Sequence, residues 1–408
     1  MKKNIFVLFT LTLFLLGCGG GKSKKDQLAP PTRVITHLTK PTVNFYVENS
    51  GSMFGYVTDG SGNDFDRSLS SLLTQMTVSG YTDSLNMYYI NSDTFHRDVD
   101  IPTFIKEITR TDKFLGKLGS TDMCELFDAI TSTVDENNVS IMVSDCIFSP
   151  GLGVNAMNYI GAEKDCITLK LHEKVKNRDL AFVVYRMISN FNGIYYDCED
   201  KKTNINNDRP YFIWIVGTKD NIAAYNNAKI EVKIEGMMAN SFTIFNSEDK
   251  SSYAVQYNPK IGDFKRDAPH KISNAKPDSY AKKFLFTVSV DFSSLLLDNE
   301  YLTDPNNYLL SNENYDIKID RNTNADNNFT HDIRISTESN IITKTTLSIK
   351  LINQIPKWIE QYNDDACTPI NADGMMEKTY GLKHLIDGIY SAYNFKNNVL
   401  TKLEIEIN

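Results

Sequence analysis

Apolar runs of strand length alternate with segments of helical periodicity between residues 41 and 235. Three of these runs, at 139–145, 180–188 and 211–217, are nearly continuous in apolar residues. Strands of this kind are typical of a parallel sheet that helices cover on both faces. The alternation therefore predicts an α/β fold built on an open, mainly parallel, doubly wound sheet.

The other elements of this region complete the pattern. Two more strands, rich in β-branched and aromatic residues, are predicted at 41–48 and 85–90. Apolar residues at three- and four-residue steps predict helices at 67–76, 104–109, 121–133, 167–175 and 221–227. Open sheets of this class bind their ligands beyond the carboxyl ends of the strands, where the strand order reverses.

From residue 229 the pattern changes to short strands separated by Asn, Asp, Pro and Ser. These strands are predicted at 229–236, 241–246, 253–257, 283–292, 315–320, 331–336 and 345–352. They predict an antiparallel, sandwich-like or barrel domain. Apolar residues between Leu382 and Tyr393 then predict an amphipathic helix that packs on a core, followed by a last strand at 399–407. We therefore expect an α/β domain at 40–228 and a β-rich domain with a C-terminal helix at 229–408.

The start of the chain carries a targeting signal. Two lysines precede an apolar run at 5–16, which is shorter than the roughly 20 residues of a membrane-spanning helix. The residues 15–18 (LLGC) then resemble the lipobox of bacterial lipoproteins. The resemblance implies that the signal peptide 1–17 is removed and that Cys18 carries the lipid. Residues 19–31 are rich in Gly, Lys and Pro, which predicts a flexible tether at 18–39. We expect the protein to be anchored in the cell envelope outside the cytoplasm, in the outer membrane. An ordinary signal peptide with a chance cysteine is the alternative.

Charge and composition restrict the class of partner. The net charge is −8 and both signs are mixed along the chain, whereas nucleic-acid binding needs a concentrated basic face. The chain has 21 Tyr and 22 Phe residues, and Asn is frequent in its second half. We therefore expect a protein or glycan ligand and no nucleic acid.

Apart from the lipidated residue, five cysteines remain: Cys124, Cys146, Cys166, Cys198 and Cys367. An odd number outside the cytoplasm leaves at least one thiol free or paired with another chain. The sequence has no CxxC and no HExxH motif, which argues against zinc. Cys124 and Cys146 follow two loops that we expect at one site, so we predict a disulfide between them.

Oxygen-bearing side chains follow the predicted strands where those strands end. Glu48 ends the first strand, Ser50 and Ser52 follow it, Thr121 opens a helix, and Asp145 ends the strand at 139–145. Carboxylate and hydroxyl oxygens are hard ligands that suit Mg²⁺, Mn²⁺ or Ca²⁺. The sequence thus predicts a divalent-metal site at the carboxyl edge of the sheet.

These segments resemble the motifs of von Willebrand factor A domains. VENSGSM at 47–53 resembles the family's Asp-x-Ser-x-Ser motif, GST at 119–121 its threonine loop, and IMVSDC at 141–146 its later strand ending in Asp. The resemblance covers about residues 40–235 and implies a metal-ion-dependent adhesion site. In that site the hydroxyls of Ser50, Ser52 and Thr121 would bind the ion directly or through water, and Asp145 would hold a coordinating water. Glu48 replaces the family's first Asp and is one methylene longer.

The leading hypothesis is therefore a non-enzymatic lipoprotein that binds a protein or glycan ligand through this metal site. One alternative is a metal-free scaffold or assembly subunit of an envelope complex. A second is a metal-assisted hydrolase that uses the same oxygen ligands. The sequence shows no additional acid or base beside Asp145, which favours the binding protein.

Overall fold

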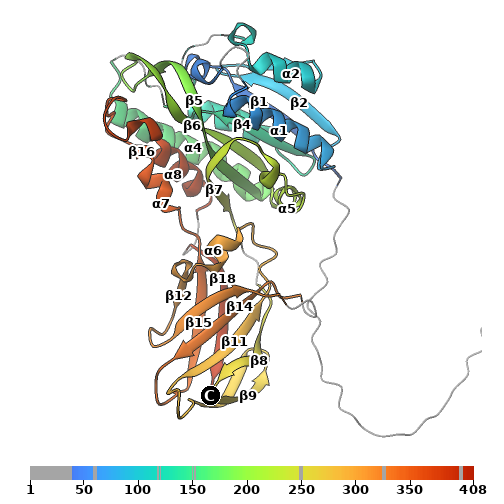
Figure 1. The fold of residues 1–408 in the computed structure, drawn as a ribbon, viewed down its shortest axis with the longest axis vertical. Coiled ribbons are helices and arrows are strands. Elements are labelled where there is room, and N and C mark those ends of the chain that lie inside the picture. The colour runs from blue at the N-terminus through green and yellow to red at the C-terminus, as the bar shows by residue number, and fades with distance from the viewer. Residues whose placement is uncertain are drawn as a thin grey trace, which may run out of the picture. The chain divides into compact units, whose positions relative to one another are not determined.

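A computed structural model describes residues 39–57, 62–116, 119, 121–148, 150, 153–247, 251–323, 328–394 and 398–408. The predicted signal peptide, Cys18 and all but the last residue of the predicted tether lie outside these ranges. Within them, no helix is both long and apolar enough to cross a membrane. The architecture is α/β, with one mixed seven-stranded sheet and further antiparallel sheets (Figure 1).

The seven-stranded sheet has the order β3-β2-β1-β4-β6-β5-β7. Its strands are β1 (Thr42–Glu48), β2 (Ser84–Ile90), β3 (Thr94–Arg97), β4 (Asn138–Ser144), β5 (Leu180–Tyr196), β6 (Lys202–Thr218) and β7 (Met237–Phe245). Strand β1 runs parallel to β2 and to β4, whereas the other four pairs are antiparallel. The sheet is therefore mixed, and the prediction that it is mainly parallel is wrong. A short turn joins β5 to β6, and strands joined in this way can only pair antiparallel.

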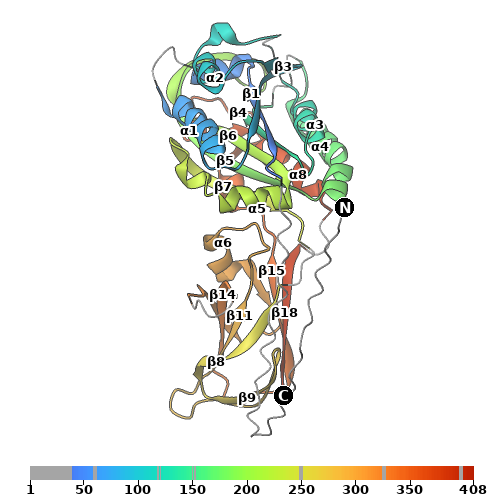
Figure 2. The same cartoon turned by 90° about the vertical axis from the view of Figure 1, so that its right-hand side faces the viewer.

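Helices cover both faces of this sheet (Figure 2). They are α1 (Asp64–Val78), α2 (Ile101–Ile108), α3 (Met123–Ser132), α4 (Ala156–Arg178) and α5 (Lys219–Asn227). Along β1, Phe45 packs in one apolar cluster with residues of α1, α2 and α5, whereas Tyr46 packs in another with residues of α3 and α4. The predicted strands lack polar alternation because both of their faces are buried.

Two smaller sheets have the strand orders β12-β15-β18-β10-β9 and β13-β14-β11-β8. Their strands are β8 (Tyr253–Ile261), β9 (Asp263–Ala268), β10 (Lys271–Lys276), β11 (Phe284–Val290), β12 (Tyr308–Leu310), β13 (Asp316–Arg321), β14 (His331–Thr337), β15 (Thr345–Ile352) and β18 (Val399–Ile407). All their pairs are antiparallel except β10 with β18. Phe264 of β9 meets Phe284 and Phe286 of β11 edge to face, at 6.1 and 6.3 Å, which joins the two sheets.

One strand prediction for this region is wrong, and a second predicted strand is found but belongs to another sheet than expected. The predicted strand at 229–236 contains instead the 3₁₀ helix η3 (Glu231–Lys233). The predicted strand at 241–246 belongs to β7, which pairs with β5 in the seven-stranded sheet. Its apolar residues Phe242 and Ile244 extend the buried face formed by β5.

The remaining elements are short, apart from one C-terminal helix. They are α6 (Asn299–Thr303), α7 (Lys357–Gln361), α8 (Leu382–Ala392), β16 (Asn363–Asp364), β17 (Thr379–Tyr380), η1 (Gly51–Tyr56), η2 (Thr111–Lys113), η4 (Pro305–Asn307) and η5 (Met375–Glu377). Helix α8 is the predicted amphipathic helix, and it packs against α4. Gly388 permits this approach, because a Cβ there would lie 2.9 Å from the carbonyl oxygen of Lys164.

Two disulfides cross-link the chain, Cys124–Cys166 and Cys198–Cys367. Cys146 is free, so the predicted Cys124–Cys146 disulfide is wrong. Its sulfur is buried and accepts a hydrogen bond from Trp214 Nε1 at 3.3 Å, whereas Cys124 faces α4. Disulfides persist in oxidising compartments, and the two found here indicate a location outside the cytoplasm.

Candidate functional site

The parallel pairing of β1 and β4 brings the two predicted carboxylates to one edge of the sheet. Val47 is paired with Val143, so Glu48 at the end of β1 lies beside Ser144 at the end of β4. Asp145 follows directly. Both carboxylates are buried, with 1% of Glu48 and 2% of Asp145 exposed.

Glu48 is surrounded by hydroxyl groups. Ser144 Oγ donates a hydrogen bond to Glu48 Oε2. Burial raises the pKa of the Glu48 carboxyl above its ordinary value, and the hydroxyls of Ser144, Ser50 and Thr121 partly oppose this shift because they favour the ionised form. Glu48 therefore lies beside two of the three hydroxyls predicted from the sequence.

Asp145 completes the set. Burial and then the negative charge of Glu48 raise the pKa of Asp145 to about 7, while the Ser52 hydroxyl and the Ile147 amide oppose the shift. The Ile147 N–H donates to Asp145 Oδ1 at 3.3 Å. Ser52 Oγ in turn lies 3.0 Å from Ser50 Oγ. The structure thus brings together all five residues that the sequence analysis selected, at one edge of the sheet.

Two oxygens of this cluster have no hydrogen-bond partner among the described residues. They are Thr121 Oγ1 and Asp145 Oδ2, and both are buried. The Thr121 hydroxyl lies close enough to Glu48 to favour its ionised form, but at no regular hydrogen-bonding geometry. Buried polar atoms are usually paired in native proteins, and a bound cation or a water molecule would satisfy these two oxygens.

The donor set consists of two carboxylates and three hydroxyls. No group of three or more His, Cys, Asp or Glu side chains suited to a metal occurs in the described part of the chain. A cation here would therefore depend on the hydroxyls of Ser50, Ser52 and Thr121 for its remaining protein contacts. Such hard oxygen donors match Mg²⁺, Mn²⁺ and Ca²⁺.

The loop after β1 is held by its neighbours. Asn49 Nδ2 donates to the carbonyl oxygen of Leu115 at 2.7 Å, and Asn91 Nδ2 donates to Asn49 Oδ1 at 2.9 Å. Further along, a Cβ at Gly193 of β5 would lie 2.8 Å from the Cα of Gly55, so two glycines permit a close backbone contact with η1. These contacts fix the loop that carries Ser50 and Ser52.

Sequence reasoning missed two residues of this region. Ser144 directly precedes Asp145, and the β1–β4 register that aligns it with Glu48 could have identified it. Arg209 of β6 is 1% exposed and its positive charge opposes the rise in the pKa of Asp145. It lies 64 residues beyond Asp145 in the sequence, and no local pattern indicates its position.

Arg209 is also tied to the C-terminal part of the chain. Its Nη1 donates to the carbonyl oxygen of Met376 at 3.3 Å, and its guanidinium lies 4.7 Å from the ring centre of Tyr195. Its Nε and Nη2 have no partner among the described residues. Arg209 is therefore a buried cationic group whose charge acts on Asp145.

Comparisons with protein-family models, with curated proteins and with solved structures find no match to this chain.

Proposed function

We propose that the seven-stranded sheet and the helices that cover it form a von Willebrand factor A-like domain that binds a divalent cation through Glu48, Ser50, Ser52, Thr121 and Asp145. The protein would use this site to bind a protein or glycan ligand while a lipid on Cys18 anchors it to a membrane. One observation carries the proposal. Two buried carboxylates converge with three hydroxyls, and two oxygens of the cluster lack a hydrogen-bond partner in the part of the chain that the structure describes.

The electrostatics of the pair support a cation. Two neighbouring carboxylates in a buried site cannot both ionise at low cost unless a positive charge joins them. Burial raises the pKa of both carboxyls, and the negative charge of Glu48 adds to the rise at Asp145. Cation binding would therefore release a proton and would strengthen as the pH rises from about 5 to about 8.

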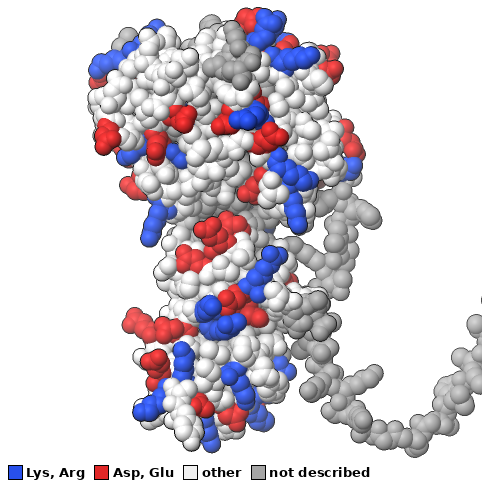
Figure 3. Space-filling view, in the orientation of Figure 1, with Lys and Arg blue, Asp and Glu red and all other residues white. Residues whose placement is uncertain are grey.

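The ligand would approach at the serine loop. Ser52 is partly exposed, whereas Glu48, Ser50, Thr121 and Asp145 are each at most 4% exposed. A cation held by these residues would offer a coordination position to an acidic group of the ligand. Acidic and basic side chains are intermixed over the face drawn in Figure 3, a surface that suits protein or glycan better than nucleic acid.

A metal-free scaffold or assembly subunit is the second candidate, and a specific observation favours it. Ser144 already donates a hydrogen bond to Glu48, and the charge of Arg209 already acts on Asp145. These internal partners, with protons on the carboxyls, would stabilise the cluster without an ion. The domain would then bind its partner through another surface.

Calorimetric titration of the purified protein, without residues 1–18, with Mg²⁺, Mn²⁺ and Ca²⁺ distinguishes the two. We expect binding that strengthens from pH 5 to pH 8 and is lost in Asp145→Asn. Asp66→Asn is the matched control, because Asp66 is a buried carboxylate of α1 outside the cluster. Glu48→Asp should strengthen Mg²⁺ binding if Glu48 is a lengthened ligand. Absence of binding at every pH in the wild type would refute the metal site and favour the scaffold.

The anchor is tested separately. We expect Cys18→Ser to release the protein from the membrane fraction or to leave it unprocessed, because acyl chains supply the membrane affinity. Metabolic labelling with a palmitate analogue and fractionation measure both effects. Unchanged labelling and unchanged sedimentation of the variant would contradict the assignment of Cys18.

A further inference from the structure

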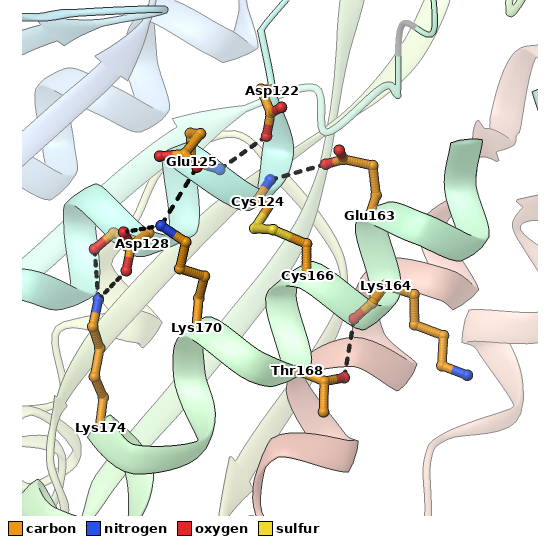
Figure 4. The surroundings of a disulfide bond; sticks show 10 residues. All are labelled: Asp122, Cys124, Glu125, Asp128, Glu163, Lys164, Cys166, Thr168, Lys170 and Lys174. Atoms are coloured by element: carbon orange, nitrogen blue, oxygen red, sulfur yellow. Dashed lines mark hydrogen bonds and ion pairs between the residues drawn. A yellow bond between two sulfur atoms is a disulfide. The ribbon is translucent and has the colours of Figure 1, made fainter. Parts of the chain in front are cut away.

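Thr121, whose buried hydroxyl has no partner among the described residues, lies next to the first turn of α3, and a disulfide cross-links that turn. Thr121 precedes α3, and Cys124 lies in the first turn of that helix. Cys124 forms a disulfide with Cys166 of α4, with the two Cα atoms 5.9 Å apart (Figure 4). The cross-link therefore fixes the start of α3 to a second helix that packs on the same face of the sheet.

The backbone of the same turn is held by α4 as well. Glu163 lies one helical turn before Cys166, and its Oε2 accepts a hydrogen bond from the Cys124 N–H at 3.0 Å (Figure 4). Asp122 caps the helix and accepts the N–H of Glu125 at 2.9 Å. The first N–H groups of a helix have no partner within the helix, so these two carboxylates satisfy donors that would otherwise be orphaned.

The rest of α3 is secured independently of the disulfide. Lys174 Nζ contacts Asp128 Oδ1 at 2.5 Å, and Lys170 Nζ contacts Asp128 Oδ2 at 3.0 Å. Arg178 donates to the carbonyl oxygens of Thr131 and Val134 at the far end, at 3.1 and 2.9 Å. Loss of the disulfide would therefore loosen the N-terminal turn of α3 while its later turns stay docked.

The Thr121 hydroxyl depends on that turn for its position, because it has no hydrogen bond of its own among the described residues. We propose that the Cys124–Cys166 disulfide and Glu163 position Thr121 in the cation site, so that cation affinity depends on both. The inference rests on the proposed function and assigns a positioning role to residues that do not touch the ion.

The choice of ion provides a readout that general destabilisation would not change. Mg²⁺ requires near-octahedral geometry at about 2.0–2.1 Å, whereas Ca²⁺ accepts variable geometry at about 2.3–2.6 Å. A displaced Thr121 should therefore weaken Mg²⁺ binding more than Ca²⁺ binding. Outer-shell partners of metal ligands typically contribute about 10- to 100-fold to affinity.

The test compares three forms of the purified protein without residues 1–18: wild type, Cys124→Ser/Cys166→Ser and the control Cys198→Ser/Cys367→Ser. We expect the first variant to lose about tenfold or more in Mg²⁺ affinity, with a smaller loss for Ca²⁺. The control variant removes the other disulfide and should keep wild-type affinity for both ions. Glu163→Ala keeps the cross-link and should also lower Mg²⁺ affinity more than Ca²⁺ affinity, by a smaller factor. This variant tests the proposal even if Cys124→Ser/Cys166→Ser does not fold.

A double-mutant cycle with Thr121→Ala completes the test. If the disulfide acts through Thr121, the losses caused by Thr121→Ala and by Cys124→Ser/Cys166→Ser should not add. Wild-type affinity in the disulfide variant and in Glu163→Ala, alongside a wild type that binds, would overturn this inference and leave the proposed function standing. A wild type that binds none of the ions would overturn the proposed function and this inference with it.

Discussion

At the scale of single residues, buried polar groups without partners are the most informative features of this protein. Asp66 is 5% exposed in the first turn of α1, and neither of its carboxylate oxygens has a hydrogen-bond partner among the described residues. Burial raises the pKa of this carboxyl to about 6. The charge of Glu48 adds to the rise in the pKa of Asp145, whereas the pKa of Asp66 is raised by burial, so we assign Asp66 no part in the cation site.

The effect of Asp66 on stability should depend on pH. The pKa of Asp66 is higher in the folded state than in the unfolded state. Its contribution to the free energy of unfolding is therefore fully present below about pH 4 and is lost as the pH rises through about 6. Asp66→Asn should therefore stabilise the protein at pH 8 by on the order of 2 kcal/mol and change little at pH 4. Urea denaturation at both pH values measures this difference. The control Asp83→Asn alters an exposed ion pair with Lys40, and a pH-dependent gain of the same size there would contradict the argument.

At the scale of elements, α8 joins the layer of helices on one face of the seven-stranded sheet although it follows the β-rich strands in sequence (Figure 1). Its buried residues Leu385, Ile386 and Ile389 share a core with α3 and α4. Thr168 Oγ1 of α4 also donates to the carbonyl oxygen of Gly388 at 3.1 Å. Close contact of two helix backbones requires a residue without a side chain at the crossing.

Two glycines provide a matched test of this contact. A Cβ at Gly388 would lie 2.9 Å from a backbone oxygen of α4, whereas a Cβ at Gly161 within α4 would meet nothing within 4 Å. Gly388→Ala should therefore destabilise the protein by about 1–2 kcal/mol, because the helices must separate. Gly161→Ala should stabilise it by about 0.5–1 kcal/mol through helix propensity. Thermal and urea unfolding measure both changes. Equal effects of the two substitutions would show that α4 and α8 do not touch at Gly388.

At the scale of the whole molecule, three contacts fasten the segment 363–381 to the β5–β6 hairpin. Cys367 is disulfide-bonded to Cys198 in the turn between the two strands. Arg186 of β5 donates to the carbonyl oxygen of Glu377 at 2.8 Å, and Arg209 of β6 donates to that of Met376 at 3.3 Å. This segment closes a loop that includes most of the second half of the chain.

Removal of the Cys198–Cys367 disulfide should have a large effect on stability. The cysteines are 169 residues apart, against 42 for Cys124–Cys166. A disulfide typically contributes about 2–4 kcal/mol to the free energy of unfolding. If it acts by lowering the entropy of the unfolded chain, the longer loop adds about 1 kcal/mol to that contribution. Cys198→Ser/Cys367→Ser should therefore lower the free energy of unfolding more than Cys124→Ser/Cys166→Ser does. If urea denaturation showed an equal or larger loss of unfolding free energy for Cys124→Ser/Cys166→Ser, this ranking would be contradicted.

Local patterns in the sequence predicted most elements of the α/β region and the members of the candidate site. The strand at 139–145 and the helix at 382–393 were predicted from apolar spacing alone, and both are confirmed with small shifts at their ends. Glu48 and Asp145 were selected because each ends a predicted buried strand. These inferences succeed because the period of apolar residues reports how each element is buried, and that information is local.

The tertiary structure decided the features that depend on which distant segments meet. The antiparallel course of β5 and β6, the addition of β7 to the same sheet, and the pairing of Cys124 with Cys166 all arise from contacts between segments distant in sequence. The same holds for Arg209, whose charge acts on Asp145 because β6 lies next to β4. Residue periodicity determines which face of a strand or helix is buried, but the partner of that face is selected by packing of the whole chain.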